Sequence, residues 1–283
     1  MNRILIVGID TVAGRSLAEQ LSGTFNVTGL WFSTPTTVSG CAVARVNKTA
    51  LNEYLVDAAT IIFCGAASQS SWNRSFGTFR PEEKWLTPCV LAAKAFGSRM
   101  VFVSSDAVFA GPWVFHDDDS MVHSEESSAQ QLRGFESEVQ ALTDSLIVRT
   151  NIVDSEGVVQ QALRAVENGR TVSVDACTYA TPVAQDEFAS SLVECLKAGM
   201  RGYVNIAGAE RTSAFQLVTI LATNLECDTR RVVAKFSADQ PVERSLRCLR
   251  LRNELNKRSS LLKDTVEHLA DSVTARRQQV TAA

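Results

Sequence analysis

The sequence predicts an α/β protein built on a doubly wound parallel sheet, with a smaller α/β part towards the C-terminus. Three observations predict this class. Strand and helix patterns alternate from the first residues, the strands are continuous apolar runs, and a glycine-containing turn joins the first strand to the first helix. Continuous apolar strands are typical of parallel sheets that helices cover on both faces.

The first elements repeat the strand–helix unit of a parallel sheet. Residues 3–7 form an apolar strand that ends at a glycine, and residues 14–21 repeat apolar side chains at helical spacing. A second strand is expected over residues 26–32, a helix over 47–56 and a buried strand over 60–64.

The middle of the chain continues this alternation. A long helix is expected over residues 81–96, with Pro81 in its first turn. Pro88 inside it predicts a kink, because proline cannot donate to the preceding turn. The next strand, helix and strand are expected over residues 99–104, 126–142 and 146–150.

The pattern loosens after residue 150, which predicts a large first part, residues 1–152, and a smaller second part, residues 153–283. Some exchange of chain between the two parts is expected. Ser213 and Gln216 form a capping box that starts a helix in the second part. The helices of this part are expected over residues 155–168, 186–197 and 213–225.

The composition excludes several classes of function. The net charge is −3 and the isoelectric point about 5.7, so no basic surface indicates nucleic-acid binding. The N-terminus lacks the apolar core of a signal peptide, and no apolar run approaches the roughly 20 residues that span a bilayer. Seven cysteines, none spaced as CxxC, indicate reduced thiols, so we expect a cytoplasmic protein without membrane partners.

Polar residues follow the predicted strands at the points where these strands end. The stretch RMVFVSSDAVFAGP, residues 99–112, breaks from an apolar run into two serines and an aspartate. Because ligands of parallel sheets bind at the carboxyl ends of the strands, these positions should meet in one crevice. They are Gly8, Cys64, Gly65, Ser104, Ser105, Asp106, Thr150 and Asn151.

The turn GIDTVAG, residues 8–14, has the context of a dinucleotide-binding loop. Gly8 permits the tight turn, and Gly14 permits close packing of helix and strand. Thr11 replaces the middle glycine that lets the backbone approach a pyrophosphate, and Asp10 adds a negative charge. Residues 1–152 are therefore expected to form a Rossmann-like dinucleotide-binding domain.

The residues that would recognise the cofactor ribose depart from the usual pattern. No acid lies between Glu19 and Glu53, although folds that prefer NAD usually have one about 20 residues after the first glycine. After the second strand, Ser33, Thr34, Thr36 and Thr37 could hydrogen-bond a 2′-phosphate, but no Arg or Lys lies between that strand and Arg45. NADP or NAD binding and a weakened pocket are both consistent with this pattern.

Motifs along about nine tenths of the chain resemble the extended short-chain dehydrogenase/reductases, and within them the dTDP-4-dehydrorhamnose reductases and their sugar-nucleotide-binding relatives. The similar segments occur in the family's order. They are GIDTVAG (8–14), IIFCGAAS (61–68), VFVSSDAVFAG (101–111), LIVRTNIV (146–153), VDACTYATPVAQDEFA (174–189), GYVNIAGAERTS (202–213) and QPVERSLRCLRL (240–251).

The resemblance implies roles for residues at the strand ends. Ser105 falls where the family has the catalytic Ser or Thr that hydrogen-bonds the substrate carbonyl, and Asp106 matches the acid after it. His116 and Arg244 would contact the sugar nucleotide, although a structural salt bridge explains Arg244 equally well. The cofactor, NADP or NAD, would contact Gly8, Thr11, Val12, Gly14, Cys64, Gly65, Ala66, Ser104, Thr150 and Asn151.

The pair that completes hydride transfer in this family is missing. In the family a Tyr protonates the ketone, and a Lys four residues later lowers the pKa of its phenol. The helix over residues 126–142 would hold the Tyr between positions 127 and 130 and the Lys between 131 and 134. These positions read SSAQQLRG, and none of the three tyrosines elsewhere has a Lys four residues later.

The segment VFHDDDSMVHSEES, residues 114–127, concentrates acidic residues with His116 and His123. Histidine and carboxylate groups suit several divalent ions, but this spacing matches no metal motif. We therefore expect a solvated acidic loop over the crevice and no metal site.

Two hypotheses follow. In the first, the chain binds a nucleotide or nucleotide sugar with little or no hydride transfer, as a homodimer or with a regulatory partner protein, like the regulatory subunit of methionine adenosyltransferase in the same family. In the second, it is an active NAD(P)H-dependent reductase or epimerase of a nucleotide-activated ketosugar that uses Ser105.

Overall fold

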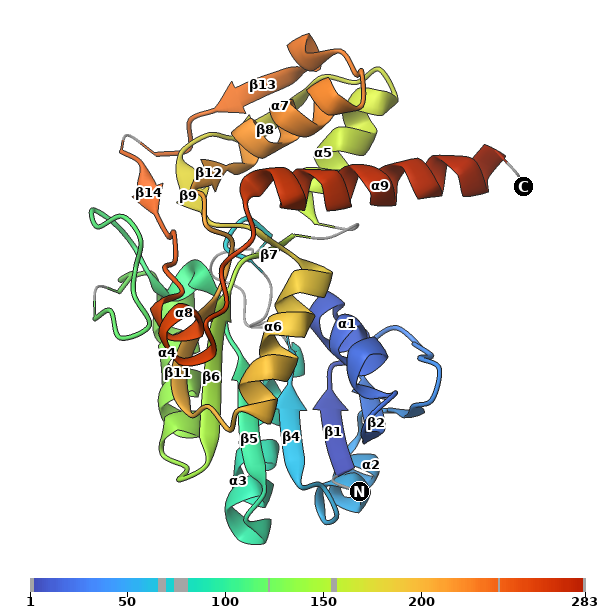
Figure 1. Ribbon diagram of the computed structural model, residues 1–283, viewed down its shortest axis with the longest axis vertical. Helices are drawn as coiled ribbons and strands as arrows, with labels where there is room; N and C mark the ends of the chain where they lie inside the picture. The colour runs from blue at the N-terminus through green and yellow to red at the C-terminus, as the bar shows by residue number, and fades with distance from the viewer. Residues whose placement is uncertain are drawn as a thin grey trace.

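The computed structural model describes residues 3–65, 70–73, 81–121, 123–153, 157–238 and 240–281 of the chain. Its large layer is a seven-stranded sheet in the order β11-β6-β5-β4-β1-β2-β3, in which every neighbouring pair is parallel (Figure 1). The predicted parallel sheet is therefore confirmed. The strands are β1 (Arg3–Val7), β2 (Asn26–Trp31), β3 (Ala42–Arg45), β4 (Thr60–Phe63), β5 (Arg99–Val103), β6 (Ser145–Thr150) and β11 (Gly202–Ile206).

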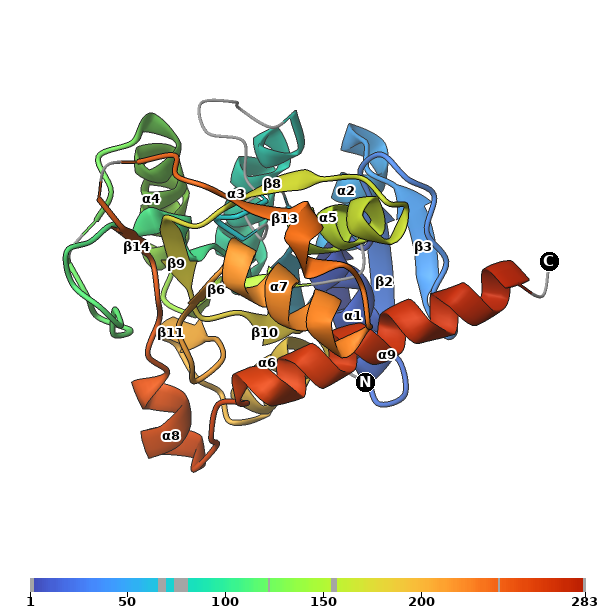
Figure 2. The same cartoon turned by 90° about the horizontal axis from the view of Figure 1, so that it is seen from above.

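Helices cover both faces of the sheet, as the continuous apolar strands predict. Helices α2 (Lys48–Leu55), α3 (Leu86–Phe96) and α4 (Ser127–Gln140) lie on one face, and α1 (Val12–Leu21) and α6 (Gln185–Lys197) lie on the other (Figure 2). This arrangement confirms the doubly wound, Rossmann-like class.

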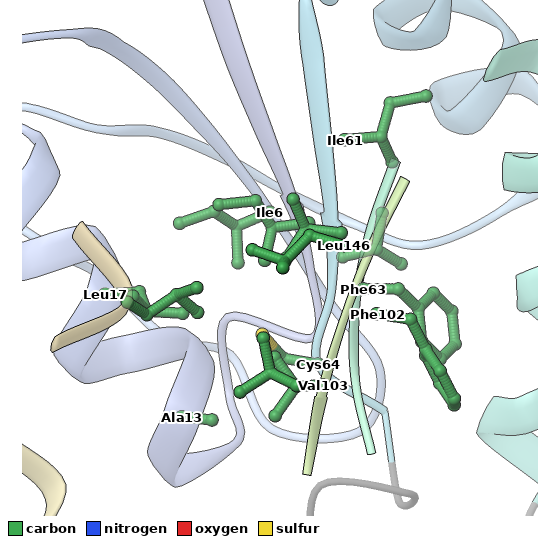
Figure 3. Close-up of a cluster of buried hydrophobic side chains, with 14 of the residues drawn as sticks. Ile6, Ala13, Leu17, Ile61, Phe63, Cys64, Phe102, Val103 and Leu146 are labelled. Atoms are coloured by element: carbon green, nitrogen blue, oxygen red, sulfur yellow. The ribbon is translucent and has the colours of Figure 1, made fainter. Parts of the chain in front are cut away.

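The core of the large layer is formed by side chains that alternate along the strands. Figure 3 shows Leu17 of α1 on the same side of the sheet as Ile6 and Val103, with Phe63 and Phe102 on the opposite side. All five are buried, and the two phenylalanine rings lie 6.2 Å apart between their centroids. Packing on both faces holds the strand ends rigidly at one edge of the sheet.

The predicted helix over residues 81–96 is wrong as a single element. Residues Pro81–Trp85 form a 3₁₀ helix (η2), and the α-helix starts only at Leu86. Pro88 is thus the third residue of α3, where its missing N–H would have no helical acceptor, so it needs no kink.

The second part of the chain lies over the carboxyl ends of the strands (Figure 1). It has its own buried cluster, which includes Val159, Leu163, Leu217, Leu221 and Leu269. Its elements are β7 (Ile152–Val153), α5 (Val158–Glu167), β8 (Val172–Asp175), β9 (Thr178–Ala180), β10 (Val183–Ala184), β12 (Thr212–Ser213), α7 (Ala214–Asn224), η4 (Thr229–Arg231), β13 (Val232–Lys235), β14 (Val242–Glu243) and α9 (Leu262–Thr281). Helix α8 (Leu249–Leu255) instead packs against β11 and α6 at the large sheet.

The chain crosses between the two parts more than once. Helix α6 and strand β11, residues 185–206, return from the second part to the large sheet, where β11 pairs with β6. The capping box of Ser213 and Gln216 is present at the start of α7, as the sequence predicts. Strand β3 was not predicted, because four residues at a sheet edge carry little apolar pattern. Among the described helices, none is long and apolar enough to span a bilayer.

Candidate functional site

The glycine turn has the compact geometry of a dinucleotide loop. Gly8 has a φ of +99°, and a Cβ atom there would lie 2.5 Å from the carbonyl oxygen of Cys64. A Cβ at Gly14 would lie 2.1 Å from the carbonyl oxygen of Gly8. Only glycine fits either position, so Gly8 permits the tight turn after β1 and Gly14 permits the close packing of α1 on that turn.

Thr11, which stands in place of the middle glycine, caps helix α1. Its hydroxyl accepts from the N–H of Gly14 at 3.1 Å and donates to the carbonyl of Gly8 at 2.7 Å. The N–H groups of Val12 and Ala13 begin the helix, where no preceding turn supplies a carbonyl acceptor. These groups form the anion-attracting end of the helix.

Asp10 ties the glycine turn to the end of strand β2. Its carboxylate accepts from the backbone N–H groups of Phe32, Ser33 and Thr34 at 2.9, 2.9 and 3.0 Å. Spacing alone did not predict this contact, because Asp10 and residues 32–34 are brought together only by the parallel pairing of β1 with β2.

Ser105 and Asp106 meet at the end of β5, inside the protein. The hydroxyl of Ser105 donates to Oδ1 of Asp106 at 3.0 Å and caps a short 3₁₀ helix, Asp106–Val108 (η3), by accepting from Ala107 N–H. The Asp106 carboxylate also accepts from the N–H and hydroxyl of Ser71 at 2.8 and 2.7 Å, and from Asn151 Nδ2 at 2.6 Å. Four donors thus surround one buried carboxylate.

Burial raises the pKa of the Asp106 carboxyl above its ordinary value, although the hydrogen bonds from Asn151 and Ser71 oppose this shift. Both Ser105 and Asp106 are fully buried. The serine that the family resemblance makes catalytic therefore bonds within the protein, to a carboxyl group beside it.

Ser104 belongs to a second buried network. Its hydroxyl donates to Oε1 of Glu136 on α4 at 2.7 Å. Arg149 on β6 donates to both oxygens of the same carboxylate, at 3.1 and 2.8 Å, and both partners are almost completely buried. The Arg149 guanidinium also lies over the rings of Phe109 and Tyr203. This bidentate pair fixes α4 against the sheet.

Three buried polar atoms, one on the neighbour of Ser71 and two at the end of β6, have no hydrogen-bond partner in the part of the chain that the structure describes. They are Ser70 Oγ, Thr150 Oγ1 and Asn151 Oδ1. Buried polar atoms are normally paired, so a polar ligand at this edge would gain hydrogen bonds from them. Cys64 and Gly65 follow β4 at the same edge, whereas Ala66 lies outside the described residues.

A cavity of about 210 Å³ adjoins this network. Ser71 and Trp72 line it together with Asp175, Thr178 and Lys235 of the second part. Ligand pockets typically measure roughly 300–1,000 Å³, so this cavity suits only part of a nucleotide-sized ligand. It lies between the strand ends and the C-terminal part.

The model of the family described as the RmlD substrate binding domain matches residues 2–272. The chain belongs to this family. No curated protein matches the chain.

Solved structures similar to this RmlD-family chain share its fold. A hypothetical dTDP-4-dehydrorhamnose reductase from Sulfolobus tokodaii is 22% identical, with a TM-score of 0.73 over 88% of this chain and 93% of its own. A dTDP-4-dehydrorhamnose reductase from Bacillus anthracis str. Ames, in complex with NADP, is 16% identical, with a TM-score of 0.73 and coverage of 95% and 99%. The UDP-N-acetylglucosamine 4-epimerase from Methanobrevibacter ruminantium M1, in complex with UDP-N-acetylmuramic acid, is 14% identical, with a TM-score of 0.79 and coverage of 98% and 99%.

In this RmlD-family member, helix α4 carries neither a Tyr nor a Lys along Ser127–Gln140. Its inward face consists of Ser128, Ala129, Leu132, Glu136 and Val139. Glu136 was missed at the level of sequence. Its signal was its spacing, four and eight residues after Leu132 and Ser128, which puts a carboxylate on the apolar face of the helix.

The prediction of a solvated acidic loop is wrong for two of its residues. His116 is buried and stacks on Phe109 at 4.3 Å, and burial lowers its pKa. Asp118 is buried because its carboxylate accepts from the backbone N–H groups of Asn205 and Arg250 at 2.6 and 3.1 Å. The loop is thus pinned to β11, at the edge of the large sheet, and to the start of α8. Among the described residues, no cluster of three or more metal-ligating side chains occurs.

Arg244 lies in the interior next to the same loop. Its Nη1 donates to the carbonyl of Ala107 at 2.7 Å, and its Nη2 pairs with Glu126 at 2.9 Å. These contacts connect the C-terminal part to the residues that follow Ser105. The substrate contacts of Arg244 and His116 stay predictions.

Proposed function

We propose that this RmlD-family protein binds a nucleotide sugar at the carboxyl edge of its sheet, with a nicotinamide dinucleotide on the glycine turn, and transfers hydride slowly or not at all. It would then act through binding, as a ligand sensor or a regulatory subunit. The observation that carries the proposal is helix α4, which has no Tyr and no Lys on any face.

The binding part of the proposal rests on the glycine turn and on relatives of the same fold. Gly8 and Gly14 give the tight turn and the close helix packing of a dinucleotide loop, and Thr11 folds back to cap α1 instead of projecting from the turn. The solved reductase of Bacillus anthracis holds NADP, and the epimerase of Methanobrevibacter ruminantium holds a UDP-sugar. Val12, Cys64, Gly65, Ser104, Thr150 and Asn151 are the further residues proposed to contact the cofactor.

The catalytic part rests on proton supply. Reduction of a ketone needs a proton on the new alkoxide oxygen, and a positioned general acid typically contributes about 10²–10⁴-fold to the rate. That factor corresponds to ~3–5 kcal/mol of activation free energy. Ser105 stands at the position of the family's catalytic Ser or Thr, but its hydroxyl donates to Asp106 inside the protein.

One observation favours the second function, an active reductase or epimerase. The hydrogen bond between Ser105 and Asp106 joins a hydroxyl to a carboxyl group whose pKa burial raises. A carboxyl group that holds its proton more tightly could resupply the serine during turnover. Replacing Ser105 with Ala should then abolish turnover, whereas unchanged turnover in that variant would show that Ser105 does not supply the proton.

The test combines binding with turnover. Thermal unfolding is measured with NAD, NADP, their reduced forms and several nucleotide sugars, and oxidation of NADPH or NADH is followed with a nucleotide-linked 4-ketosugar. A ligand at a hundred times its Kd stabilises the folded protein by about 2.7 kcal/mol, which raises Tm by roughly 5–10 °C.

We expect stabilisation by a nucleotide sugar and turnover far below the ordinary enzymatic rate of about 10 s⁻¹. Turnover near that rate would overturn the proposal that hydride transfer is slow. If no nucleotide or nucleotide sugar raises Tm, the proposal of binding is wrong as well.

A further inference from the structure

The carboxylate of Asp10 occupies the place where dinucleotide-binding folds recognise the adenosine ribose. That place is the end of the second strand, where an acid usually accepts from the ribose 2′-hydroxyl. No acid follows β2 in this chain, but three consecutive backbone N–H groups there, at residues 32–34, donate to Asp10. The parallel register of Val7 with Leu30 brings the glycine turn beside this strand end.

We propose that Asp10 is the specificity-determining residue of the dinucleotide site and selects NAD(H) against NADP(H). The inference rests on the proposed function, because it concerns the cofactor half of the same site. Asp10 would then replace the acid that usually follows the second strand, because its carboxylate reaches the same place from the glycine turn.

The hydrogen bonds of Asp10 leave room for a ribose hydroxyl. Each carboxylate oxygen can accept about two hydrogen bonds. Within the described residues, Oδ1 accepts from Phe32 N–H alone, whereas Oδ2 accepts from Ser33 N–H, Ser33 Oγ and Thr34 N–H. Asp10 is only partly buried, and Oδ1 has the capacity for a second hydrogen bond.

The same contacts disfavour a 2′-phosphate. Consecutive backbone N–H groups form an anion-binding concavity that would suit the phosphate of NADP. Here the anion is already supplied by Asp10, so an incoming phosphate would meet a negative charge instead of three donors. No Lys or Arg lies between residues 32 and 44 to offset that charge.

Arg45 is the one cation in the sequence immediately after this stretch, and it provides a matched control. It lies at the end of β3, paired in register with Trp31, and its guanidinium lies 5.6 Å from the centroid of the Trp31 ring. If Arg45 bound a 2′-phosphate, the site would prefer NADP despite Asp10. Replacing Arg45 with Gln therefore distinguishes the two residues.

The experiment is isothermal titration calorimetry of the full chain with NAD⁺ and NADP⁺. We expect the wild type to bind NAD⁺ at least tenfold more tightly than NADP⁺. Asp10→Asn and Asp10→Ser should narrow that ratio about tenfold, chiefly by strengthening NADP⁺ binding, and Arg45→Gln should leave it within about twofold. Circular dichroism of each variant checks that the fold is retained.

Replacing Asp10 also removes its hydrogen bonds with the backbone N–H groups of residues 32–34, so a double variant is needed to separate that loss from the effect of the charge. Asp10→Ser combined with Ser33→Asp moves the carboxylate to the strand end and should restore the preference for NAD⁺. Equal or tighter binding of NADP⁺ by the wild type, or an Asp10 variant with an unchanged ratio, would overturn the inference and leave the proposed nucleotide site intact. Binding of nucleotide sugar without any dinucleotide would also overturn it, whereas no binding of either class would reject the proposed function itself.

Discussion

The two ends of the crevice differ in how their polar groups are satisfied. At the glycine turn, the groups that would hold a ligand are backbone N–H groups at a helix start and a partly exposed carboxylate. At the end of β5, Ser104, Ser105 and Asp106 are fully buried and bond to other side chains of the protein. The first turn of α1 leaves backbone N–H groups without a carbonyl acceptor, whereas the three side chains at the end of β5 bond within the protein.

The difference shows that binding and catalysis place separate demands on the same fold. A dinucleotide loop depends on backbone geometry, which two glycines and a strand–helix packing maintain. Proton transfer depends on individual side chains, and a single helix face can lose them without any change in the sheet. Four substitutions test whether the two ends are as independent as this comparison indicates.

The largest effect is expected at the buried ion pair of Glu136 and Arg149. Replacing Glu136 with Ala leaves the Arg149 guanidinium buried without its carboxylate, which should cost about 3–5 kcal/mol of unfolding free energy. Urea unfolding measures the loss. The double variant Glu136→Leu with Arg149→Met should recover most of it, because an apolar pair replaces the ionic one. A loss below about 1 kcal/mol would contradict a buried, unscreened pair.

The next effect is expected at Asp106. Replacing it with Asn turns an N–H₂ group towards buried donors and should lower the free energy of unfolding by about 1–3 kcal/mol. Because burial raises the pKa of Asp106 in the folded state, the protonated form is favoured by folding. The contribution of this carboxyl is therefore complete below its unfolded pKa of about 3.9 and is lost as pH rises through the raised folded value.

The wild type should accordingly lose stability over that pH range relative to Asp106→Asn, in urea unfolding at a series of pH values. A difference between the two proteins that stays constant with pH would show that Asp106 has the same pKa folded and unfolded.

A smaller effect is expected at Thr11, on the cofactor side. Replacing it with Ala removes the cap of α1 and should cost about 1 kcal/mol, whereas Gly should cost only a few tenths. The Gly variant also restores the middle glycine, so it should bind a dinucleotide several-fold more tightly than the wild type in calorimetry. Weaker binding by the Gly variant would indicate that the Thr11 side chain itself contacts the ligand.

The smallest effect is expected at the exposed pair of Asp117 and Arg247. This pair has bonds of 2.5 and 2.7 Å, but Arg247 is half-exposed, so replacing it with Ala should cost only about 0–1 kcal/mol. Arg247 lowers the pKa of Asp117, so this contribution is present at neutral pH and is lost as pH falls through the lowered folded value. The Tm of the wild type and the variant in low and high salt measures this contribution. A loss of stability as large as that of the Glu136 variant would show that burial does not explain the difference between the two ion pairs.

The sheet and its ligand-binding edge could be predicted from local patterns. The apolar runs at residues 3–7 and 99–103 are strands because such runs are stable only when both faces are covered. Ser104 to Asp106 and Thr150 to Asn151 lie at strand ends, as their polar character predicts. The capping box of Ser213 involves only four consecutive residues, so it could be predicted from the sequence as well.

The long-range hydrogen bonds of the candidate site could not be predicted from local patterns. Asp118 is buried by N–H groups 87 and 132 residues further along the chain, and Asp10 is held by groups 22 to 24 residues away. Ser71 bonds to Asp106 across 35 residues with no motif around it. A charged residue in a polar segment is predicted to be solvated, because its hydrogen-bond partners are distant in the sequence and are known only from the folded structure.

Composition and periodicity were enough to specify the α/β class, the glycine turn and the lack of a Tyr and Lys on α4, because these depend on residue type and short-range spacing. The hydrogen bonds of Asp106 with Ser71 and Asn151, the burial of Glu136 and the position of Asp10 at the end of β2 arose only when distant segments packed together. Hydrogen bonds and desolvation act over a few ångströms, so side chains far apart in the chain acquire their partners only in the folded protein.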